Sequence, residues 1–135
     1  MREILFKAKR IDNGEWVEGL LWKKKYNSNK IFISCFPDED DNEEAFVVDS
    51  KTICQYTGLT AKNGNKIWEN DVVEGLYLFG MKINAVVVFK DGAFGLKWHR
   101  GSVEEFSAFT SICNVSYEVI GNIFDNAELL KAGEA

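Results

Sequence analysis

Apolar and polar residues alternate along most of the chain, which is the pattern of strands that bury one face. Alternation over residues 3–10 resumes over residues 15–22, and residues 12–14, Asp-Asn-Gly, lie between them. Alternating segments on either side of a glycine-containing turn predict a β-hairpin. Apolar runs at residues 31–36 and 45–49 predict two further short strands.

The second half of the chain carries a longer series of strand signals. Residues 83–89 are dense in β-branched side chains, and an Asp-Gly pair at 91–92 joins them to a partner strand at residues 93–99. Residues 117–124 form the last predicted strand.

Two segments predict short helices. Ser102 and Glu105 have the spacing of a capping box, which predicts a helical turn over residues 101–106. Residues 125–130 combine capping residues with two leucines and predict a last helical turn.

Charge is distributed unevenly. The net charge is −5. Residues 1–30 contain eight basic and four acidic side chains, whereas residues 31–50 contain seven acidic and no basic ones. This predicts a dipolar surface and disfavours a general nucleic-acid-binding surface, which needs a basic excess. The acidic run at residues 38–44 lacks the ligand spacing of a calcium loop and is interpreted as solvated, with mimicry of a phosphate track as the alternative.

The remaining composition argues against metal, cofactor and membrane sites. Cys35, Cys54 and Cys113 are widely spaced and His99 is the single histidine, so no zinc motif is present and reduced thiols in a cytoplasmic protein are expected. The sequence has no phosphate-binding glycine loop, no signal segment and no apolar stretch of membrane-spanning length. His99 has no predicted catalytic partners and is interpreted as a surface or turn residue. We therefore expect no cofactor and no enzymatic activity.

One short segment has the composition of an interaction surface. It interleaves aromatic rings with cations, a combination that can stack on single-stranded nucleic acid. The acidic balance of the whole chain favours a soluble hairpin end instead. The residues of this candidate surface are Trp22, Lys23, Lys24, Lys25 and Tyr26.

Three ordered motifs resemble the YopX family of phage and prophage proteins. The first is the start Met-Arg-Glu-Ile with a following Phe-Lys-Ala, and the last is the Val-Ile-Gly-Asn-Ile-Phe run at residues 119–124 with Glu-Leu-Leu at 128–130. Between them lies Cys-Gln-Tyr-Thr-Gly-Leu at 54–59, followed by Lys-Asn-Gly at 62–64 and Ile-Trp-Glu-Asn-Asp-Val-Val at 67–73. Asn70 stands where the family usually has glycine, which removes a residue suited to positive φ, and Ala127 stands where it usually has proline.

The resemblance implies an all-β protein with minor helical turns. It implies a small N-terminal β-sheet or hairpin unit at residues 1–56, a connecting segment at 57–70, an SH3-like β-barrel at 71–125 and a C-terminal helical turn and tail at 126–135. It implies no catalytic residues. We expect the middle motif to form a structural seam between the two units, with Tyr56 and Trp68 packed there, and the seam residues are Tyr56, Gly58, Asn63, Gly64, Trp68 and Asp71. The candidate core of the barrel is Val72, Ile83, Val86, Val88, Phe94, Leu96, Val119 and Ile123.

The expected function is a phage or prophage accessory protein that binds another protein through its β surface without catalysing a reaction. A nucleic-acid-associated barrel module is the alternative, and it depends on fold analogy. An enzyme with an unrecognised site is a third hypothesis, which a deep polar pocket around His99 would favour. Exposed aromatic residues and open sheet edges also predict a homo-oligomer.

Overall fold

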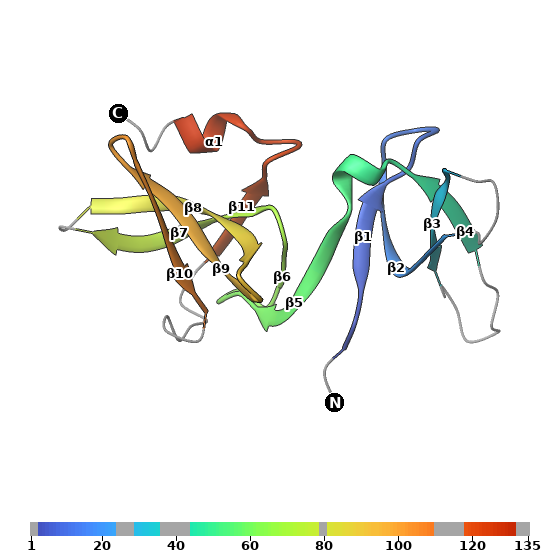
Figure 1. The fold of residues 1–135 in the computed structure, drawn as a ribbon, viewed down its shortest axis with the longest axis horizontal. Coiled ribbons are helices and arrows are strands. Elements are labelled where there is room, and N and C mark those ends of the chain that lie inside the picture. Colours follow the sequence, from blue (N-terminus) through green and yellow to red (C-terminus); the bar gives the residue numbers. More distant parts are fainter. Residues whose placement is uncertain (1–2, 24–28, 36–43, 79–80, 110–117, 132–135) are drawn as a thin grey trace. The chain divides into compact units, whose positions relative to one another are not determined.

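The computed structural model describes residues 3–23, 29–35, 44–78, 81–109 and 118–131. The chain divides into two compact units, residues 1–56 and residues 57–135 (Figure 1). The described residues are mostly β-strand, with antiparallel pairing throughout, which confirms the predicted fold class. No helix in these ranges is both long and apolar enough to cross a membrane.

The first unit contains four complete strands and the start of a fifth. The predicted hairpin is confirmed, because the first two strands pair with Phe6 opposite Gly19 and Lys9 opposite Trp16. The strands of this unit have the order β4-β3-β2-β1-β5, which is part of a six-stranded sheet that one further strand completes beyond β5. The elements are β1 (Phe6–Lys9), β2 (Trp16–Lys23), β3 (Ile31–Cys35), β4 (Glu44–Val48), a 3₁₀ helix (Ser50–Thr52) and β5 (Cys54–Thr60).

The sheet of this unit bends round a small apolar core. Ala8, Ile33 and Val48 are buried at its centre. An isolated bridge joins Arg10 to Val48, and Asp49 N donates to Lys9 O at 2.8 Å, so the end of β4 is tied to the end of β1. The sheet therefore curls, because β1 and β4 are not neighbours in the strand order and yet are bridged at one end.

The second unit begins within β5 and consists mainly of a five-stranded sheet. The end of β5 and β6 (Lys66–Trp68) form a hairpin, in the segment that the sequence predicted to be a connection. The sheet has the order β10-β9-β8-β7-β11. Its elements are β7 (Asp71–Leu78), β8 (Met81–Lys90), β9 (Ala93–Arg100), β10 (Val103–Ala108), β11 (Glu118–Asn122) and the helix α1 (Glu128–Lys131).

The SH3-like barrel is not confirmed. Strands β10 and β11 lie at opposite edges of the sheet, and no pairing between them closes it within the described residues. The number and length of the strands do not by themselves determine whether a sheet closes into a barrel. Closure also requires a particular stagger between the first and last strands.

The helical turn predicted over residues 101–106 is wrong. Val103–Ala108 is the strand β10, paired with β9 along its whole length. Lys97 and Glu104 form an ion pair at 3.5 Å across these strands, as do Arg100 and Glu105 at 3.6 Å. A capping box indicates only a local preference for helix, and the pairing of β10 with β9 outweighs that preference here. The last helical turn is confirmed as α1.

The predicted core is only part of the observed one. Val72, Val86 and Leu96 are buried as expected, whereas the other predicted residues are half-buried. The main cluster of the second unit lies on the opposite face of β8 from Val86. Because Ala85, Val86 and Val87 are all buried, both faces of β8 are covered. The cluster consists of Ala61, Ile67, Val73, Ala85, Val87, Leu96 and Trp98.

Candidate functional site

The predicted aromatic and cationic surface falls at the end of β2. Trp22 and Lys23 are the last residues of this strand, whereas Lys24, Lys25 and Tyr26 lie outside the described residues. The Trp22 ring stacks on Phe32 of β3, with ring centroids 4.3 Å apart and planes 9° from parallel. Trp22 Nε1 also donates a hydrogen bond to Ser34 Oγ at 2.6 Å. The ring is thus held in one orientation while 38% of the residue stays exposed.

Trp22 belongs to a wider surface on the first unit. Alternate residues of β1 to β4 point away from the core formed by Ala8, Ile33 and Val48, since side chains alternate along a strand. We call this surface the outer face. Leu20 on it is 48% exposed. From the pairing registers, the outer face comprises Lys7, Lys9, Trp16, Glu18, Leu20, Trp22, Phe32, Ser34, Ala45 and Val47.

Cations lie over the second tryptophan of the outer face. Lys7 Nζ and Lys9 Nζ lie 4.8 Å and 5.5 Å from the Trp16 ring centroid. Such contacts are favourable by about 0.5–1 kcal/mol at exposed sites. Trp16 and Trp22 therefore both have partners within the unit. The stack on Phe32 has no local sequence signal, because it depends on the register of β2 with β3.

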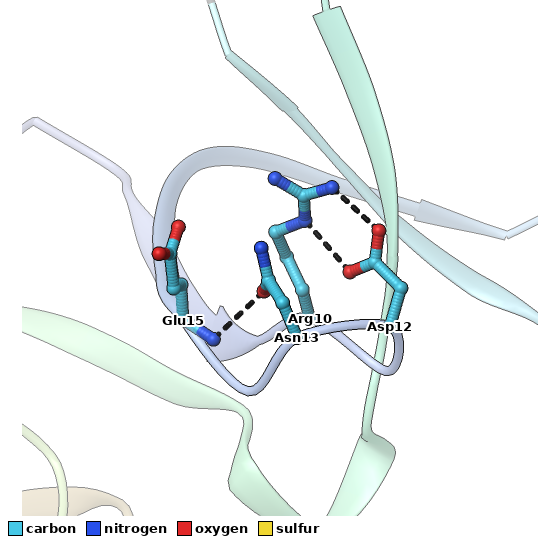
Figure 2. Close-up of polar contacts among 4 residues, drawn as sticks. All are labelled: Arg10, Asp12, Asn13 and Glu15. Atoms are coloured by element: carbon cyan, nitrogen blue, oxygen red, sulfur yellow. Dashed lines mark hydrogen bonds and ion pairs between the residues drawn. The ribbon is translucent and has the colours of Figure 1, made fainter.

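The hairpin loop between β1 and β2 is ordered by its polar side chains (Figure 2). Arg10 binds the Asp12 carboxylate through two nitrogens, with Nε to Oδ1 at 2.9 Å. Asn13 Oδ1 accepts from Glu15 N at 2.9 Å. The hydrogen bonds from Arg10 hold the pKa of Asp12 below its ordinary value. The Arg10 guanidinium also lies 4.2 Å from the Phe46 ring centroid. These contacts have a structural role in the loop.

The predicted seam residues form two turns. The first turn, between β5 and β6, holds Asn63 and Gly64, and Asn63 Oδ1 accepts from Asn65 N at 3.3 Å. Gly64 and Gly58, which lies within β5, both have φ of 87°, a conformation that favours glycine. In the second turn Asp71 Oδ2 accepts from Trp68 N at 2.8 Å, and both residues are buried. Tyr56 is buried at the end of the first unit. Packing of Tyr56 with Trp68 stays a prediction.

Asn70 occupies the position where the resemblance predicted a loss of positive φ. Its φ is 73°, so the left-handed conformation is retained. Its backbone N donates to Val87 O at 2.7 Å and its carbonyl accepts from Ile123 N at 3.0 Å. Asparagine tolerates this conformation better than most residues with a β-carbon.

A pocket of about 320 Å³ lies in the second unit, on the face of the sheet that carries Val86. α1 lies beside β8 there (Figure 1), and Asn84 Nδ2 donates to Leu129 O at 2.9 Å. Strand β9 supplies alternate side chains that point to the same face. The apolar lining includes Val86, Val88, Ile123 and Leu130, and the polar lining includes Asn70, Asn84, Lys97 and His99.

The pocket places His99 in a concave site, although the sequence indicated a surface or turn residue. His99 is exposed, and no side-chain hydrogen bond or ion pair joins it to another residue in the described ranges. A catalytic histidine needs a group that orients it and a reacting group within reach. In the pairing of β9 with β10, Glu104 lies directly opposite His99, and the pocket has the shape of a binding site.

The cysteines and the acidic run are the other candidate groups. The described residues contain no group of three metal-ligating side chains. Cys35 and Cys54 are free thiols, and burial raises the pKa of Cys35, which disfavours the reactive thiolate. Cys113 and most of the acidic run at residues 38–44 lie outside the described residues, and Glu44 begins β4.

Comparison with known proteins gives a matching family and a solved structure with a similar fold. The family model described as YopX protein matches residues 5–131. The crystal structure of protein EF1440 from Enterococcus faecalis is similar, with 23% sequence identity, a TM-score of 0.56, and coverage of 96% of this chain and 99% of that chain. That likeness shows a shared fold. No curated protein matches the chain. With a match over nearly its whole length, the chain belongs to the YopX family.

Proposed function

We propose that this protein is a phage or prophage accessory protein that binds another protein through the outer face and catalyses no reaction. The observation that carries the proposal is the ring of Trp22, which is fixed by its stack on Phe32 and is still exposed, beside the exposed Leu20. Tryptophan is enriched among the residues that dominate binding energy at interfaces, and a ring already fixed before binding loses little conformational freedom. Reduced cysteines fit a cytoplasmic location.

The charges of the first unit favour an acidic partner surface. Lys7, Lys9 and Lys23 lie on or beside the outer face. The acidic run of the same chain has the complementary charge, which supports self-association into a homo-oligomer. In this arrangement the lysines form the rim and the apolar residues form the centre of the contact.

A nucleic-acid-binding module is the second candidate. The contact of Lys7 and Lys9 with Trp16 places cations and an aromatic ring together, as single-strand binding sites do. The ring of Trp22 offers less to a base, because Phe32 already stacks on it. The protein-binding proposal therefore explains more of the outer face.

Affinity capture from a lysate of the cells that naturally make the chain tests the two candidates. The proposal expects a protein that remains bound after nuclease treatment and that the double variant Leu20→Ser/Trp22→Ser no longer captures. Phe89→Ser, at an exposed apolar residue of the second unit, is the matched control and should capture normally.

The same variants are compared by sedimentation velocity. A homo-oligomer that dissociates only in the double variant supports self-association through the outer face. Capture that nuclease abolishes supports the second candidate. A monomer that captures nothing, or a double variant that binds as well as the wild type, contradicts the proposal.

A further inference from the structure

The pocket of the second unit combines an apolar floor with nitrogen donors at its rim. Its volume of about 320 Å³ is at the small end of the range for ligand sites, roughly 300–1,000 Å³. Val86 and Val88 of β8 form part of the floor, and Ile123 and Leu130 add to it from the C-terminal segment. An occupant must therefore be small and carry a compact apolar group.

The rim determines the charge of the occupant. Lys97 and His99 are two residues apart on β9, so their side chains share a face. Lys97 lies opposite Val86 in the pairing with β8, so the Cα of Lys97 is next to the apolar floor. Both side chains can donate hydrogen bonds, and Lys97 carries a positive charge. No carboxylate is among the residues that line the pocket.

One carboxylate competes for Lys97 from outside the pocket. Glu104 Oε1 lies 3.5 Å from Lys97 Nζ, and both side chains are partly exposed, 49% and 36%. Exposed pairs of this kind contribute little, about 0–1 kcal/mol, so Lys97 can turn to a ligand at small cost. Asn84 adds a further donor, because only one of its two amide hydrogens is used by Leu129 O.

We infer that this pocket binds a small monocarboxylate with a branched apolar group, the apolar group on Val86 and Val88 and the carboxylate at Lys97 and His99. A single ammonium matches a single negative charge, and no arginine or glycine-rich loop is present to hold a phosphate. A carboxylate close to a branched apolar group occurs in a free short-chain acid and at the end of a polypeptide that terminates in leucine. The pocket is separate from the outer face of the first unit, so the inference is independent of the proposed protein-binding function.

The test is a titration of the ¹⁵N-labelled full chain, followed through its backbone amide resonances. The probes are 4-methylpentanoate and the uncharged 4-methylpentanamide. Saturable shifts at residues 84–88 and 97–99 are expected for the acid, with the amide binding about tenfold more weakly, because it lacks the charge-assisted contact. Equal affinity for acid and amide, or no shift at millimolar concentration, overturns the inference.

Two pairs of variants locate the site. Lys97→Met should weaken binding about tenfold. Lys90→Met should not, because Lys90 lies on the same face of the sheet, on β8, but outside the pocket lining. Val88→Phe should block the floor, whereas Val103→Phe at an exposed position should bind normally. Thermal melting shows that each variant is folded. Binding that survives both Lys97→Met and Val88→Phe contradicts this location.

The two sources of the ligand are distinguished with a short glycine peptide ending in leucine. A free C-terminus that binds more tightly than 4-methylpentanoate identifies a polypeptide end, and the amidated peptide should not bind. Binding of the free acid alone identifies a small metabolite. Both results support the shared chemistry.

Discussion

At the scale of single residues, the backbone of Asn70 links three parts of the second unit. Asn70 has a positive φ, and its backbone contacts both Val87 and Ile123. The resemblance to the family indicated that replacement of glycine here removes the positive-φ option. The structure shows that asparagine keeps it, since its short polar side chain tolerates the left-handed region.

The first prediction compares two substitutions at this residue. Asn70→Gly and Asn70→Ala lose the same side-chain contacts but differ in tolerance of positive φ. We expect Asn70→Ala to lower the free energy of unfolding by about 1 kcal/mol more than Asn70→Gly, measured by urea denaturation. At Asn63, which is not among the described residues with positive φ, alanine should be no worse than glycine. An alanine variant as stable as the glycine variant at position 70 would contradict the strain argument.

At the scale of elements, the short 3₁₀ helix fixes the first strand. Thr52 Oγ1 accepts from Lys9 N at 2.9 Å and donates to Asp49 O at 2.7 Å. Thr52 is buried, so water cannot replace these bonds easily. The helix Ser50–Thr52 was not predicted, because three residues give no periodic pattern.

The second prediction concerns this link. Thr52→Val keeps the shape of the side chain and removes the hydroxyl, which leaves Lys9 N without its acceptor. We expect a loss of about 1–3 kcal/mol in the free energy of unfolding. Thr60→Val, at an exposed position of β5, should change it by less than about 0.5 kcal/mol. Similar stability of the two variants would show that the hydroxyl is not needed to hold β1.

At the scale of the whole molecule, each unit has its own apolar core. Ile33 is fully buried in the first core and Leu96 in the second. No residue belongs to both clusters. The effects on stability of one substitution in each cluster are expected to add.

The third prediction tests this independence by amide hydrogen exchange. Ile33→Ala should speed exchange in β1 to β4, and Leu96→Ala in β7 to β9, each with a local cost of about 2–5 kcal/mol. The strands of the other unit should keep their protection, and the double variant should show the sum of the two effects. Faster exchange in both units from either single variant would contradict the division.

The sequence by itself determined the class of fold, the hairpin at residues 6–23, the last helical turn and the family. These features depend on local alternation, turn residues and ordered motifs, which are all properties of neighbouring residues. Only the tertiary structure decided that Val103–Ala108 is a strand, that Trp22 stacks on Phe32 and that His99 borders a pocket. It also decided which strands form the edges of the second sheet. Each depends on strand order and register, which are set by side chains far apart in the chain and therefore leave no local pattern.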